Sequence, residues 1–135
     1  MRVVLDTNVL ISALVFGGVP QTLLQQAIVG RFQPVTSPTL LDELDEKLTT
    51  KFRWQRLIVA ATRLRLENIC DVVSTTDHLS VIKEDPDDDR VLECAIAGRA
   101  NYIISGDRHL LKLGLYEGIV VLSIRQFMDI LNPTT

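Results

Sequence analysis

Two apolar patterns alternate along this chain, and together they predict its architecture. Short continuous runs such as Val3–Leu5 and Tyr102–Ser105 are typical of strands buried on both faces of a parallel sheet. Elsewhere apolar residues recur at helical spacing, as in the stripe formed by Leu40, Leu44 and Leu48. Alternating strands and helices indicate an α/β fold, a three-layer α/β/α sandwich with a central, mostly parallel sheet.

Breaks in these patterns set the limits of the predicted elements. We expect strands at residues 3–5, 32–36, 102–105 and 118–122, with a further short strand at 81–82. Helices are expected from about residue 10, at 20–30, from 38, at 54–70, 85–98 and 124–131, and Pro20 suits the first position of its helix. The residues of helix 54–70 predicted to face the core are Leu57, Ile58, Ala61, Leu64 and Ile69.

Composition places the chain among globular proteins. Its 135 residues are 47% hydrophobic, with mean hydropathy +0.21, which predicts one domain over residues 1–135. No apolar run reaches the ~18 residues that span a bilayer, and no signal-peptide pattern precedes the first strand, so we expect a cytoplasmic protein without membrane contact. Cys70 and Cys94 lie in apolar helical stretches, which is typical of buried thiols.

Charge bears on which partners the chain can hold. A net charge of −3 and a pI of about 5.3 do not fit a broadly basic nucleic-acid-binding surface. Six cations nevertheless fall between residues 47 and 65, four of them arginines. They form either a local contact for nucleic acid or a solvated helix face, and the sequence favours neither.

Four carboxylates stand where a single pocket could gather them. Asp6 ends the first strand and Asp107 follows the strand 102–105, and parallel strands bring such ends to one edge of a sheet, where ligands bind. Asp88 lies three, four, seven and eight residues before apolar positions, so it shares the core-facing side of its helix. Glu43 flanks the buried stripe of the helix that begins at residue 38.

Each acid also has an ordinary structural explanation. Glu43 can pair with Lys47 one turn later, Asp6 and Asp107 can cap helices, and the acids at 85–89 suit a helix N-terminus. Their joint placement favours a site, because neighbouring buried carboxylates repel one another. A hard divalent cation would relieve that repulsion, and Mg²⁺ takes oxygen ligands.

Four segments, in order along nearly the whole chain, resemble the PIN-domain ribonucleases, including the VapC-like toxins of toxin–antitoxin modules. These segments are Val4–Leu10, Ser37–Leu44, Asp85–Ala95 and Tyr102–Leu111. The acids that match the family's metal-binding and catalytic positions are Asp6, Glu43, Asp88 and Asp107. The residues that match supporting positions are Asn8, Ser105 and Asp89. This subgroup usually has Asn where Asp89 stands, so Asp88 and Asp89 compete for the third ligand position, and helical facing favours Asp88.

The resemblance also implies a function. It points to a ribonuclease that uses one or two Mg²⁺ or Mn²⁺ ions to hydrolyse RNA phosphodiester bonds, leaving a 5′-phosphate. It further implies the toxin of a type II module, with an antitoxin partner and a homodimeric state. Arginines of the segment 53–65, with Arg108 and Lys112, either track the RNA backbone or are solvated.

Two rival functions come from other classes. A haloacid-dehalogenase-type phosphotransferase also begins with an Asp on its first strand, but it normally needs a second Asp where this chain has Asn8. The other rival is a PIN-like scaffold that has lost activity, and the presence of all four acids argues against it.

Overall fold

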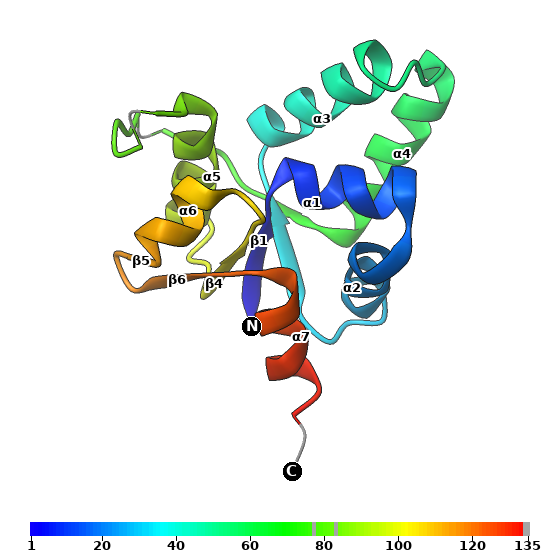
Figure 1. The fold of residues 1–135 in the computed structure, drawn as a ribbon. Helices are drawn as coiled ribbons and strands as arrows, with labels where there is room; N and C mark the ends of the chain where they lie inside the picture. The colour runs from blue at the N-terminus through cyan, green and yellow to red at the C-terminus, as the bar shows by residue number, and fades with distance from the viewer. Residues whose placement is uncertain (77, 83, 134–135) are drawn as a thin grey trace.

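The computed structural model describes residues 1–76, 78–82 and 84–133, which form a mixed α/β fold around a six-stranded sheet (Figure 1). The strands are β1 (Arg2–Leu5), β2 (Gln33–Thr36), β3 (Asp71–Val72), β4 (Tyr102–Ile104), β5 (Leu115–Tyr116) and β6 (Ile119–Leu122). Their order is β3-β2-β1-β4-β6-β5, and β5 runs antiparallel to β6 while the other neighbours pair in parallel. The predicted mostly parallel sheet is confirmed.

Helices cover both faces of this sheet. One face carries α1 (Thr7–Ile11), which continues into a π-helical turn (Ser12–Phe16), then α2 (Gly18–Ile28), α3 (Pro38–Thr50), α4 (Arg56–Ile69) and α7 (Ile124–Leu131). The other face carries α5 (Pro86–Ala97) and α6 (Arg108–Leu113). Each set of helices packs in an apolar cluster against its face of the sheet, with Leu40 of α3 reaching the second cluster, and this makes the α/β/α sandwich.

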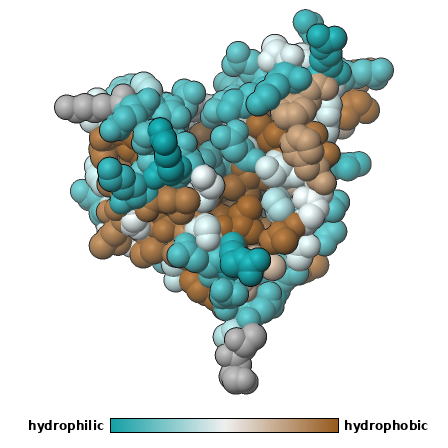
Figure 2. Space-filling model, in the orientation of Figure 1, coloured by the Kyte–Doolittle hydropathy of each residue, from teal (hydrophilic) through white to brown (hydrophobic). Residues whose placement is uncertain are grey.

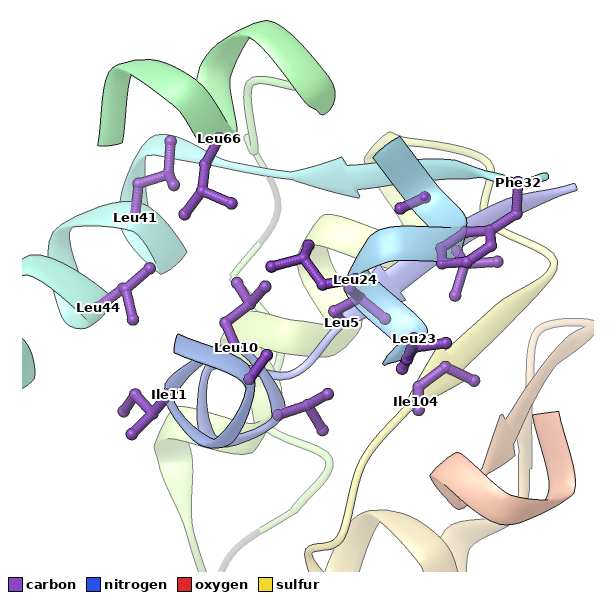
Figure 3. Packing of buried hydrophobic residues seen from close by; sticks show 14 of the residues in the cluster. Leu5, Leu10, Ile11, Leu23, Leu24, Phe32, Leu41, Leu44, Leu66 and Ile104 are labelled. Atoms are coloured by element: carbon purple, nitrogen blue, oxygen red, sulfur yellow. The ribbon is translucent and has the colours of Figure 1, made fainter. Parts of the chain in front are cut away.

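The central strand β1 is buried on both sides, as its apolar run predicts. Val3 and Val4 have no exposed surface. Val3 belongs to the cluster under α1 to α4 and Val4 to the cluster under α5 and α6, because successive side chains of a strand point to opposite faces. Figure 3 shows the first cluster, in which Leu5 lies among leucines of α1 and α2.

The face that α4 buries differs from the prediction. Leu57, Ile58 and Leu64 are 84%, 52% and 61% exposed, whereas Val59 and Leu66 enter the core. Helix α4 carries apolar residues around much of its circumference, so periodicity alone does not select the inward face. The prediction for Leu57, Ile58, Ala61 and Leu64 was therefore wrong.

Two smaller expectations also fail. Val81 and Ile82 form no strand, because their N–H groups bond to the Asp89 carboxylate rather than to a neighbouring strand. Pro20 is the third residue of α2, since the helix begins at Gly18.

No single helix in the described ranges is long and apolar enough to cross a membrane. The segments Thr7–Phe16 and Gly18–Ile28 meet the length and composition criteria only as a pair bent by 105°. Both contribute buried residues such as Leu10 and Leu23 to the core, which explains their apolar character.

The carboxyl ends of the parallel strands share one edge of the sheet. Beyond this edge the α3–α4 pair rises on one side and the α5–α6 pair on the other (Figure 1). The outline of the surface is notched between these two lobes (Figure 2).

Candidate active site

Strand register places Asp6 beside Ser105. Leu5 pairs with Ile104 across β1 and β4, so the next residue of each strand emerges at the same point. The buried Ser105 hydroxyl donates a 2.7 Å hydrogen bond to Asp6 Oδ2. Burial raises the pKa of Asp6 by more than this hydrogen bond lowers it, and the nearby charges of Glu43 and Asp107 raise it further.

Ser105 also connects Asp6 to Asp107. The Asp107 backbone N–H donates to Ser105 Oγ at 2.9 Å. The Asp107 side chain caps α6, since its Oδ1 accepts from the N–H groups of His109 and Leu110 at 2.8 and 3.2 Å. Capping fixes this carboxylate at the edge of the sheet, as the cap interpretation expects, and leaves its second oxygen for other contacts.

Helix α5 brings two further acids to Asp107. Asp85 caps α5, accepting from the Asp87 N–H at 3.1 Å, and Asp88 follows in the first turn. Asp85, Asp88 and Asp107 each offer a carboxylate oxygen, and these atoms all lie within 4.8 Å of one another. We call these three residues the acidic cluster.

The electrostatics of the acidic cluster are unfavourable for three full negative charges. Burial, and then hydrogen bonding with Asp107, raise the pKa of Asp88 to about 8. Burial also acts to raise the pKa of Asp107, but hydrogen bonds from Asp88, Leu110 and His109 outweigh it, so that pKa is lowered. Bringing the two carboxyl groups together therefore favours a proton on Asp88 over a second negative charge beside Asp107. Within the described part of the chain, no Lys or Arg forms an ion pair with the cluster.

One oxygen of Asp88 has no hydrogen-bond partner. Asp88 is only 5% exposed, and its Oδ2 is buried without a donor among the described residues. Leaving a buried acceptor unsatisfied is expensive. An oxygen-seeking divalent cation fits this arrangement, because Mg²⁺ is typically held by one or two carboxylates and its own waters. Asp88 and Asp107 are the side chains best placed to hold such an ion, with Asp85 alongside.

Asp89 lies in a different environment from Asp88. Its Oδ1 accepts from the N–H groups of Val81 and Ile82 at 3.0 and 2.9 Å. Glu93, one turn later, accepts from the Leu79 N–H at 2.9 Å and pairs with Arg90 at 2.7 Å. Asp89 and Glu93, which we call the loop anchors, tie the loop before α5 onto that helix. Asp89 therefore contacts backbone donors rather than the other acids.

Glu43 stands on the opposite side of Asp6, on α3. It accepts from the Thr7 hydroxyl at 3.1 Å and pairs with Lys47 at 3.0 Å. Lys47 also donates to Asn8 Oδ1 at 3.3 Å. The helical i,i+4 pair that the sequence offers as an alternative is thus present. Asn8 is held by this lysine, and its side chain forms no hydrogen bond to Asp6.

The structure therefore brings most of the sequence-predicted acids together and separates Asp89 from them. Asp88 and Asp107 meet directly, with Asp6 linked through Ser105 and Glu43 close enough to raise the pKa of Asp6. From the sequence, Asp85 was expected only to place a favourable charge at a helix N-terminus. The pair Asp85-Pro86 was the available signal, because an Asp before Pro marks the cap and fixes Asp85 one turn before Asp88.

A comparison with protein families agrees with this geometry. The family model described as PIN domain matches residues 2–109. That span runs from β1 into α6 and includes every acid named above. No curated protein matched the chain.

Proposed function

This chain belongs to the PIN-domain family, whose members are generally metal-dependent nucleases, and from that premise we propose that it is a divalent-metal-dependent ribonuclease. The observation that carries the proposal is the acidic cluster, in which three carboxylates converge and Asp88 keeps a buried oxygen without a donor. The substrate would be RNA, single-stranded or in structured loops, and the products would carry 5′-phosphates.

The proposed roles follow from the contacts of each residue. Asp6, Asp88 and Asp107 would hold the ion directly or through water, with Asp85 as a further donor. Ser105 keeps the Asp6 and Asp107 ends in register through its two hydrogen bonds. A bound Mg²⁺ or Mn²⁺ lowers the pKa of water and stabilises charge on the phosphate.

Glu43 is proposed to orient the attacking water or to serve as an additional ligand. Its carboxylate is fixed by Thr7 and Lys47, and Lys47 also fixes Asn8. In the hydrolysis, the water oxygen forms a bond to phosphorus while the bond to the 3′-oxygen breaks. The Glu43 carboxylate would accept the proton lost by the water, and the leaving 3′-oxygen would take up a proton from solvent to become a hydroxyl.

Calorimetric titration with Mn²⁺, paired with cleavage of labelled RNA, tests the proposal. We expect wild-type protein to bind Mn²⁺ and to release 5′-phosphorylated products, with EDTA abolishing cleavage. Asp6→Asn should lose both properties. Asp129→Asn, an exposed acid on α7, is a matched control and should retain both. A wild-type protein that binds no Mn²⁺ and cleaves no RNA would instead favour the non-catalytic scaffold.

We further propose that the enzyme is a toxin of a type II module and that a protein partner covers α4. The support is the segment resemblance together with the exposed side chains of Leu57 and Leu64, which lie seven residues apart on one helix face with Ala61 between them. Figure 2 shows hydrophobic atoms at the surface over this lobe. Such a partner could also place a basic side chain among the cleft carboxylates.

Co-expression with the product of the neighbouring open reading frame tests the partner. Co-purification that is lost in Leu57→Asp/Leu64→Asp, with RNA cleavage by that variant unchanged, is the expected result. A second copy of the chain is the alternative occupant. Sedimentation at twice the 15.1 kDa chain mass would support the homodimer, and the monomer mass at micromolar concentration would exclude it.

A further inference from the structure

A basic pocket borders the acidic cluster. It is an open hollow of about 660 Å³ between α6 and the loop before α5, a volume typical of small-ligand sites. Arg108, His109 and Lys112 of α6 line one side. Val81 and Ile82 of the loop line the other. We call this space the α6 pocket.

Chain connectivity joins the α6 pocket to the acidic cluster on both walls. Arg108 directly follows Asp107, and Glu84, which also lines the pocket, directly precedes Asp85. Consecutive Cα atoms are only about 3.8 Å apart. The pocket therefore begins within one residue of the acidic cluster on both walls, where a polymer bound at the cluster can reach it.

The charge of the α6 pocket suits a phosphodiester. Arg108 and Lys112 are exposed, and within the described ranges neither they nor His109 forms an ion pair. Guanidinium and ammonium groups bind phosphate oxygens with charge-assisted hydrogen bonds. By contrast Arg63 on α4 is held by Asp42 and Asp45 at 2.7 Å each, so its guanidinium group is already occupied and does not offer the same phosphate contact.

The loop wall of the pocket is fixed in place by α5. The loop anchors bind the N–H groups of Leu79, Val81 and Ile82, and Arg90 donates to the Leu79 carbonyl at 3.2 Å. These bonds hold the apolar side chains of Val81 and Ile82 opposite the cations of α6. The result is a pre-organised site in which the basic side of α6 faces a mainly apolar loop that also carries the Glu84 carboxylate.

We propose that the α6 pocket binds the nucleotide next to the scissile phosphodiester of the RNA substrate, its phosphate on Arg108 and Lys112 and its base against Val81 and Ile82. This inference rests on the proposed ribonuclease activity. It makes Arg108 and Lys112 substrate-positioning residues. Their positive charges would attract the RNA to the acidic cleft although the whole chain has a net charge of −3.

The test compares two double variants that remove the same charge. Arg108→Ala/Lys112→Ala alters the α6 pocket, and Arg56→Ala/Arg65→Ala removes two exposed cations from α4. Cleavage of a short RNA, its dependence on salt, and Mn²⁺ binding are measured for each. We expect the pocket variant to lose on the order of 10-fold or more in kcat/KM and to show a salt slope shallower by about 1–2. The α4 variant should stay near wild type, and Mn²⁺ binding should be unchanged in both.

A substrate with one neutral methylphosphonate locates the contact. Moved along the RNA, this linkage should weaken wild-type cleavage when it neighbours the scissile bond, and it should cost the pocket variant nothing further there. Equal losses in both double variants, or no loss in the pocket variant while wild type cleaves, would overturn the pocket and leave the ribonuclease standing. Wild type that neither binds Mn²⁺ nor cleaves RNA would overturn both.

Discussion

Helix α5 places its buried carboxylates in two opposite environments. In the acidic cluster, Asp88 meets Asp107 and Asp85 and keeps one oxygen without a donor. In the loop anchors, Asp89 and Glu93 meet backbone N–H groups, and Glu93 an arginine as well. The exposed fractions are nearly equal, 5% for Asp88, 3% for Asp89 and 5% for Glu93.

Burial alone therefore does not identify a functional acid. What distinguishes the two sets is whether hydrogen-bond donors of the protein bind the ionised carboxylate. Donors satisfy the loop anchors, and such carboxylates stabilise the structure. Burial, together with the neighbouring carboxylates, raises the pKa of Asp88 to about 8, and its Oδ2 receives no hydrogen bond from the described residues in return. Perturbed groups of this kind concentrate at functional sites.

The largest predicted effect is a loss of RNA cleavage, which distinguishes the acidic cluster from the loop anchors. Asp88→Asn should reduce RNA cleavage by at least about 100-fold, because it removes a proposed ligand. It should also stabilise the metal-free protein at pH 8 by on the order of 1–2 kcal/mol, since the amide carries no charge to bury or repel. Urea unfolding without metal and RNA cleavage with Mn²⁺ measure the two effects.

Asp87→Asn is the matched control for this change. Asp87 lies in the same helical turn but is exposed, so it should leave both cleavage and stability near wild type. Loss of stability in Asp88→Asn, or equal loss of cleavage in the two variants, would contradict the proposed metal site at Asp88.

The second prediction concerns the loop anchors. Asp89→Ala should destabilise the protein by about 2–4 kcal/mol, because the N–H groups of Val81 and Ile82 lose their acceptor. Asp89→Asn should stay within about 1 kcal/mol of wild type, since an amide oxygen can accept the same two bonds. If Asn destabilised as much as Ala, the negative charge of Asp89 itself would be needed, and the comparison would fail.

The third prediction is a pH dependence of the metal-free protein. A carboxyl whose folded pKa is raised binds protons more tightly when folded, so its contribution to stability is fully present below the unfolded value of 3.8 and is lost as pH rises through the folded pKa of about 8. The melting temperature should therefore fall between pH 5.5 and 8.5. Added Mn²⁺ should reverse the fall, because the metal binds the deprotonated form. The lowered pKa of Asp107 acts only below 3.8, outside this window.

Asp88→Asn again provides the control for pH. In that variant both the fall in melting temperature and the Mn²⁺ response should be much reduced, leaving only the contribution of the buried Asp6, whose pKa is also raised. An unchanged slope in the variant would assign the pH dependence to another group.

Sequence pattern was sufficient for features that depend on a single element. The run Val3–Leu5 identified the central strand, and the spacing from Asp88 to its apolar neighbours placed that side chain inward. It was insufficient where the decisive partner lies on another element. The donors that bind Asp89 come from Val81 and Ile82 of the loop, and Asp85 joins Asp107 only once α5 and α6 are packed.

The misjudged face of α4 has the same cause. Its apolar residues satisfy the helical period in two directions, so the choice between Leu57 and Val59 depends on how α4 docks against α3 and the core. Local pattern specifies that an amphipathic helix forms, while tertiary contacts decide which side it buries.

The smallest predicted effect comes from Glu43, which resembles neither set fully. It is charged and near Asp6, but Lys47 pairs with it and both side chains are partly exposed, 23% and 33%. Glu43→Gln should therefore change the stability of the metal-free protein by less than about 0.5 kcal/mol. Its Mn²⁺ affinity and cleavage should fall less than in Asp88→Asn, because α3 contributes a water-orienting group beside an ion held mainly from α5 and α6. Complete loss of Mn²⁺ binding in Glu43→Gln, measured by the same calorimetry, would make α3 an equal partner in the metal centre and shift that centre from Asp85 toward Asp6.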